Sequence, residues 1–228
     1  MLVAWRVKEC GILRLIGALS DLHLGSSAPP AVHTKPTTFF AGAVRNLSIL
    51  GRPLSDEPQE IADKAAELVP LCTGIQNLDM YCVPFHDHIA VLGNLRPTRL
   101  AMESAYISPN AGIPATHPFF SQVTHLQLGS DEGIDLEDLA AQLPSLPCLT
   151  HISGEDLSDT EVSRMLAVCV GPTSLYVEKN SIYDRRYVRL RCGVPLFEWQ
   201  VGVHTGKDYW SRAEEIIASR LDGELHRV

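Results

Sequence analysis

One six-residue pattern recurs seven times along this chain, and it constrains the fold more than any other feature. The pattern is apolar-x-x-Leu-x-Leu, with looser copies in which Pro or Gly replaces one apolar residue. Its central residues are Leu22, Leu47, Leu78, Leu100, Leu126, Ile152 and Leu175. Successive copies lie 25, 31, 22, 26, 26 and 23 residues apart. A single match of this kind arises by chance in many proteins, but seven in one register do not.

Each copy predicts a short β-strand, because its last two apolar residues are two apart and therefore point to the same side of an extended chain. Helical patterns lie between the strands: one that starts near Ser55 or Asp56 and runs to Val69, two shorter ones at 85–92 and 136–143, and one that follows the capping box Ser158–Glu161. A strand, a turn and a helix in each period of roughly 20–29 residues are typical of leucine-rich repeats. The predicted fold class is an α/β leucine-rich-repeat solenoid of about seven irregular repeats, with a parallel sheet on its concave side.

The chain divides into two predicted parts. Residues 1–183 form the repeat array, with an irregular loop at 25–43 that is rich in Pro, Ser and Thr and lacks helical periodicity. Residues 184–228 form a C-terminal cap, with a strand at 184–192 and an amphipathic helix within 206–220 that places Trp210 on its apolar side. A Cys-x-Gly echo at Gly74 and Gly171 predicts left-handed turns that end helices.

Composition narrows the class of function. A formal net charge of -8 argues against a nucleic-acid binder, which needs a basic surface to displace counterions. No apolar run approaches the roughly 20 residues needed to cross a bilayer, and Arg14 interrupts the one near the N-terminus. The six widely spaced cysteines are typical of buried, reduced thiols. We therefore expect a cytoplasmic or nuclear protein that contacts neither membranes nor nucleic acid.

Several segments carry a family resemblance. They are Phe39–Leu47, Leu71–Leu78, Pro118–Leu126, Leu146–His151 and, most specifically, the Asp-Tyr-Trp-x-Arg-Ala sequence at Asp208–Ala213. The chain resembles uncharacterised F-box-associated leucine-rich-repeat-like proteins of mushroom-forming fungi, the basidiomycetes. That resemblance implies an array that recognises a substrate or partner, in some members preceded by an F-box that docks to a ubiquitin-ligase scaffold.

This chain departs from the plan of that family. It opens at a repeat and has no F-box sequence upstream, which counts against attachment to a ubiquitin-ligase scaffold. A truncated gene product that lacks its F-box and first cap is an alternative explanation for this opening.

The predicted concave face is polar and mildly acidic. If the Leu-x-Leu residues face the core, this face presents Asp21, His23, Asn46, Ser48, Asn77, Asp79, Tyr81, Arg99, Glu103, His125, Gln127, His151, Ser153, Glu155, Ser174, Tyr176 and Glu178. Tyrosine and arginine are favoured interface anchors. We therefore predict partner contacts at Tyr81, Arg99, Glu103, His125, His151 and Tyr176; the alternative is a merely solvated sheet face.

We expect no enzyme, cofactor or metal. His125 and His151 would lie about 4.8 Å apart on adjacent strands, but two imidazoles are too few ligands for a zinc site. Neither a Gly-x-Ser-x-Gly nucleophile motif nor a phosphate-binding loop occurs in the chain. The sequence thus predicts a non-enzymatic protein-interaction module with an unknown protein partner. The alternative is a metal-dependent hydrolase that uses His86, His88, His125 and His151.

Overall fold

The computed structural model describes the chain from the first strand to the last helix, with gaps. The described residues are 12–16, 37–50, 66–67, 69–81, 89–108, 112–129, 136–154, 157–168, 184, 186–188, 190, 198–199, 201–202 and 205–225. None of the helices in these ranges is both long and apolar enough to cross a bilayer.

Six parallel strands form one sheet in the order of the chain. Their bounds are β1 Ile12–Ile16, β2 Asn46–Leu50, β3 Asn77–Tyr81, β4 Arg99–Glu103, β5 His125–Gly129 and β6 His151–Gly154. Strands β2 to β6 coincide with five of the seven predicted copies, so the α/β class, the parallel sheet and these five strands are confirmed. The copies centred on Leu22 and Leu175 lie outside the described residues, as does most of the predicted helix from Ser55 to Val69.

The strand that pairs with β2 is one the sequence did not predict. Strand β1 at Ile12–Ile16 pairs with it in parallel, from Ile12 opposite Asn46 to Ile16 opposite Leu50. The six-residue pattern does occur here, as Cys10-Gly-Ile-Leu13-Arg-Leu15 with cysteine as its first apolar residue, and Leu13 lies opposite Leu47. Strand β1 therefore takes the place beside β2 that the sequence analysis gave to the copy centred on Leu22.

The start of each strand repeats one arrangement of hydrogen bonds. The backbone N–H groups of Thr124 and His125 both donate to the carbonyl of Thr98, at 2.8 and 3.1 Å, and those of Thr150 and His151 both donate to Thr124 at 2.9 Å. The hydroxyls of Thr124 and Thr150 donate to the same two carbonyls at 3.0 Å. Equivalent positions of successive copies therefore lie directly side by side.

The predicted apolar positions form the core on one side of the sheet. The members from the described strands are Leu47, Ile49, Leu78, Met80, Leu100, Met102, Leu126, Leu128 and Ile152, all at most 2% exposed. Phe119 and Phe120, in the 3-10 turn Pro118–Phe120, join them in an edge-to-face pair with ring centroids 5.0 Å apart. The hydrophobic effect of removing these side chains from water is what stabilises the stack of strands.

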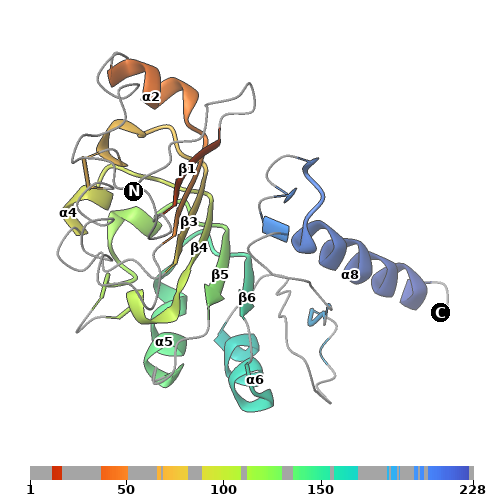
Figure 1. The fold of residues 1–228 in the computed structure, drawn as a ribbon. Helices are drawn as coiled ribbons and strands as arrows, with labels where there is room; N and C mark the ends of the chain where they lie inside the picture. The colour runs from red at the N-terminus through yellow and green to blue at the C-terminus, as the bar shows by residue number, and fades with distance from the viewer. Residues whose placement is uncertain are drawn as a thin grey trace, which may run out of the picture.

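Short helices connect the strands. They are α2 Thr37–Ala43, α4 Ile89–Leu92, α5 Leu136–Gln142 and α6 Asp159–Val168, with further 3-10 turns at Val69–Leu71, Ser104–Tyr106 and Leu143–Ser145. Figure 1 shows α2, α4 and α5 on one side of the sheet and the long helix α8, Tyr209–Leu225, on the other. The structure confirms α5, α6 and α8 as predicted helices, although α8 starts and ends a few residues later than expected. Helix α4 confirms the described half, Ile89–Leu92, of the short helix predicted at 85–92.

Helix α6 begins with the predicted capping box. The backbone N–H of Ser158 donates to the Glu161 carboxylate at 2.5 Å, and the N–H of Glu161 donates to the Ser158 hydroxyl at 3.4 Å. The predicted apolar side, Val162, Met165 and Leu166, is buried. Cap and apolar spacing together therefore identified this helix correctly.

Two predictions about connecting segments were wrong. The segment 25–43 is not wholly irregular loop, because Thr37–Ala43 forms α2 and buries Phe40 beside Phe39, with ring centroids 5.5 Å apart. Seven residues are too few to display a helical period, so this helix depends on the tertiary packing of the two phenylalanines. Gly74 does not take a left-handed conformation, since only Gly206 among the described glycines has a positive φ. A Cβ on Gly74 would lie 2.1 Å from the carbonyl oxygen of Ala41, so glycine allows two backbone segments to approach.

The predicted strand at 184–192 is also wrong where it can be checked. Its described residues form no strand, and the N–H of Tyr187 closes a turn on the carbonyl of Asp184 at 3.0 Å. The Asp184 carboxylate accepts from the backbone N–H and the guanidinium of Arg186, which holds the turn. An aspartate that bonds the chain two residues on competes with extended structure. The proposed boundary at residue 184 stays a prediction.

Candidate functional site

The face of the sheet opposite the core carries polar side chains in rows. One row crosses four strands in register, Asn77, Arg99, His125 and His151, and a second contains Asp79, Gln127 and Ser153. A buried parallel sheet is usually apolar on both faces. These polar rows make this face, which we call the polar face, the candidate functional surface of the sheet.

Much of the polar face is covered, contrary to the expectation of an open concave surface. Asp79, Gln127, His151 and Ser153 are between 0% and 7% exposed. The C-terminal segment, residues 208–214 at the start of α8, supplies the contacts over β4, β5 and β6 that are described below. This segment belongs to the predicted C-terminal cap, and its contact with the polar face was not predicted.

Asp208 fixes the N-terminus of α8 to β4. Its carboxylate Oδ2 lies 2.6 Å from Nη1 of Arg99, and its Oδ1 accepts from the backbone N–H of Ser211 at 2.9 Å. The hydroxyl of Ser211 in turn accepts from the N–H of Asp208 at 3.1 Å. One buried carboxylate thus caps the helix and neutralises a cation of the sheet. Gly202 allows this approach, because a Cβ there would lie 2.2 Å from Cβ of Asp208.

Gln127 links two tyrosines from distant parts of the chain. Its amide nitrogen donates to the hydroxyl of Tyr81 at 3.0 Å, and its amide oxygen accepts from the hydroxyl of Tyr209 at 2.6 Å. The ring of Tyr81 lies over Gly129, where a Cβ would be 2.4 Å from its Cε1 atom. Both ends of the amide are therefore hydrogen-bonded within the protein, and the amide joins β3, β5 and α8.

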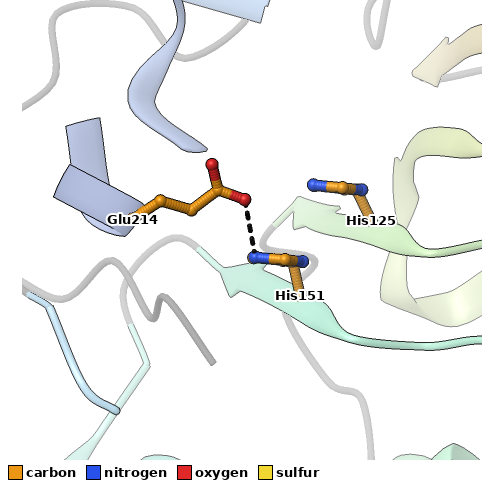
Figure 2. Close-up of side chains that lie close together, drawn as sticks. All are labelled: His125, His151 and Glu214. Carbon is orange, nitrogen blue, oxygen red and sulfur yellow. Dashed lines mark ion pairs between the residues drawn. The ribbon is translucent and has the colours of Figure 1, made fainter. Parts of the chain in front are cut away.

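The two histidines of the polar face form a stacked pair. The rings of His125 and His151 are parallel within 1°, with centroids 4.2 Å apart, and Trp210 packs edge-on against both at 5.3 and 5.7 Å. Figure 2 shows that each ring directs one nitrogen toward Glu214 of α8. That nitrogen of His151, Nε2, lies 3.1 Å from the Glu214 carboxylate.

Burial keeps the histidine pair neutral. The pKa of His125 is lowered from 6.5 to about 3, first by burial, then by the neighbouring His151 and by Arg99. Burial also lowers the pKa of His151, and the Glu214 carboxylate partly offsets that effect. At neutral pH both rings therefore offer a lone pair instead of a positive charge.

This arrangement predicts that the protein loses stability in mild acid. Because the unfolded chain binds a proton on His125 near pH 6.5 and the folded chain only near pH 3, stability is full above about pH 6.5 and falls as the pH drops toward 3. Between pH 7 and pH 5 we expect a loss of about 1–2 kcal/mol in the free energy of unfolding, measured by urea denaturation. His125→Gln should flatten this dependence, and an equally steep curve in that variant would contradict the assignment.

One group of described residues could hold a metal ion. The ligand atoms of His125, His151 and Glu214 all lie within 4.8 Å of one another. From the sequence, the two imidazoles alone were too few for a metal site, because nothing in the sequence places residue 214 beside strands β5 and β6. His86 and His88, the other histidines of the hydrolase alternative, lie outside the described residues.

The six residues predicted to contact a partner do not all lie together in the structure. Arg99, His125 and His151 lie in one row and contact the C-terminal segment, while Tyr81 and Glu103 are half-buried at the last residues of β3 and β4. Tyr176 lies outside the described residues. Of the cysteines predicted to be buried, Cys72 is buried, which raises the pKa of its thiol to about 12, whereas Cys148 is exposed in a turn after α5. Both are free thiols.

No protein-family model matches this chain, and no curated protein or solved structure is significantly similar to it.

Proposed function

We propose that the chain is a leucine-rich-repeat-type solenoid whose polar face recognises a protein partner. The observation that carries the proposal is the asymmetry of the sheet. Its apolar face builds the core with the connecting helices, and its other face holds polar side chains at equivalent positions of successive strands. A core does not need this second face to be polar, so an ordered row of polar groups supports recognition of another surface.

Contacts with the C-terminal segment support the same proposal. An Arg–Asp ion pair, a buried tyrosine hydroxyl and a tryptophan edge against stacked rings are the side-chain types that dominate protein interfaces. The segment occupies the β4–β6 part of the polar face. We therefore place the external partner at the margin formed by the ends of β3 and β4, where Tyr81 and Glu103 are half-exposed.

The resemblance to F-box-associated repeat proteins supports the same class of function. A recognition array of that kind selects the protein that the rest of an assembly acts on. The partner would then be a protein whose basic or hydrogen-bonding side chains complement Glu103 and Tyr81.

A matched pair of charge reversals tests this placement. Glu103→Lys alters the polar face, and Asp138→Lys makes the same change of net charge at an exposed position of α5. We expect affinity purification with quantitative mass spectrometry to recover the same partners with wild type and Asp138→Lys, and to lose them at least about tenfold with Glu103→Lys, since like charges across an interface repel. Identical partner sets for both variants would refute the polar face as the recognition surface. Circular dichroism would verify that both variants are folded.

A further inference from the structure

We propose that His125, His151 and Glu214 form a zinc-binding site that fastens α8 to the sheet. The site would take Zn²⁺ from solution and join the second turn of α8 to strands β5 and β6 through metal–ligand bonds. This goes beyond recognition of a protein partner and does not depend on it.

The threonines before the two strands orient the histidines for this task. Nδ1 of His125 lies 2.8 Å from the hydroxyl of Thr124, and Nδ1 of His151 lies 2.8 Å from that of Thr150. Each hydroxyl also donates to the carbonyl at the start of the preceding strand, so it can accept the Nδ1 proton. Metal-binding histidines almost always donate their other ring N–H in this way, which leaves the Nε2 lone pair for the ion.

The Nε2 atom of His151 supplies an independent observation. It belongs to a side chain that is only 9% exposed, and the Glu214 carboxylate oxygen that lies 3.1 Å away forms no well-aligned hydrogen bond with it. A buried polar atom that makes no hydrogen bond carries a desolvation penalty. A metal ion between this nitrogen and the Glu214 carboxylate would remove that penalty, and it would also explain why the atom points out of the sheet.

Charge and access suit a divalent ion. Glu214 contributes the negative charge, and its side chain is 53% exposed, which leaves a path from solvent. Two imidazoles and one glutamate are a ligand set that zinc uses when a fourth position is left to water.

Loading must tilt the two rings toward each other. In the parallel stack, with centroids 4.2 Å apart, the two lone pairs run side by side and do not converge. Tetrahedral zinc with bonds of about 2.0–2.1 Å would bring the two nitrogens to roughly 3.3 Å. The exposed Glu214 side chain can follow the ion. We therefore expect zinc to bind with loss of the stack and with closer attachment of α8.

Zinc titration of the chelator-stripped full-length protein tests the proposal. A chromophoric zinc chelator serves as competitor, and the variants are Glu214→Gln and Glu215→Gln. Both remove one negative charge from an exposed residue of α8, but only the first removes a ligand. We expect one zinc per chain in wild type and in Glu215→Gln, and a higher melting temperature when zinc is added to wild type. In Glu214→Gln the affinity should fall by at least the roughly 10–100-fold that the loss of an outer-shell partner costs, because a direct ligand is removed.

Three results would overturn the proposal: no stoichiometric zinc in wild type, equal affinities in the two variants, or an unchanged melting temperature on loading. The decisive variant changes an exposed side chain, so a folding defect does not obscure the outcome. Cobalt substitution adds a readout of the ligands, because the visible spectrum of Co²⁺ in wild type should change in Glu214→Gln and not in Glu215→Gln.

Discussion

Replacing Trp210 with alanine is expected to lower the free energy of unfolding by about 3–5 kcal/mol, the usual range for a buried tryptophan. Trp210 is 2% exposed and contacts the rings of His125, His151 and Tyr209, the last with centroids 4.8 Å apart. Its removal would leave a cavity between α8 and the sheet and abolish the aromatic contacts. Guanidinium denaturation followed by circular dichroism measures the loss.

Leu221→Ala is the matched control for this substitution. Leu221 lies on the same helix but is 41% exposed, so its truncation should change stability by less than about 0.5 kcal/mol. Trp210→Phe should fall between the two variants, because it keeps an aromatic ring at the histidine pair. If Trp210→Ala lowered the free energy of unfolding no more than Leu221→Ala does, the contact between α8 and the polar face would not contribute to the stability of the fold.

Local periodicity was enough to locate strands β2 to β6. A strand reveals itself within six residues, through two apolar positions two apart, and the in-register stacking then follows from repetition. Leu78 and Met80 are 0% and 1% exposed, as that spacing predicts. The capping box at Ser158 was visible for the same reason, since its two hydrogen bonds join residues three apart. Both features can be recognised in the sequence because they depend only on residues a few positions apart.

The candidate site could not be predicted in the same way. Arg99 and Asp208 are 109 residues apart, and Tyr209 is 82 residues from Gln127. Neither the spacing of residues on α8 nor the alternation on the strands indicates which surfaces will meet. The sequence identified His125 and His151 as neighbours, because both follow the same repeat, but the third member, Glu214, belongs to no repeat.

The predicted exposure of the polar residues on the sheet was wrong for two of them. Gln127 and Ser153 occupy outward positions of the sheet, and polar side chains at such positions usually face water. They are 3% and 4% exposed because the chain covers its own polar face. The amide nitrogen and oxygen of Gln127 form hydrogen bonds with tyrosine hydroxyls from β3 and α8. These bonds replace hydrogen bonds to water and offset the cost of burying the side chain. Only tertiary structure reveals such a covering.

The ion pair between Arg99 and Asp208 should respond unequally to the loss of its two partners. Arg99→Ala leaves the Asp208 carboxylate, which is 3% exposed, without its cation, and breaking a buried pair in this way costs about 3–5 kcal/mol. Asp208→Ala leaves a guanidinium side chain that is 32% exposed and can be hydrated, so the charge penalty is smaller. The loss of the helix cap then adds about 1 kcal/mol.

A double-mutant cycle measures this asymmetry. Arg99→Ala combined with Asp208→Asn should be more stable than Arg99→Ala alone, because the amide removes the buried negative charge while its oxygen still accepts from the N–H of Ser211. Asp208→Asn alone isolates the ion pair from the cap. Strictly additive effects would mean that the two side chains are not coupled. That result would remove the electrostatic reason for α8 to dock on the polar face and leave Trp210 as its main anchor.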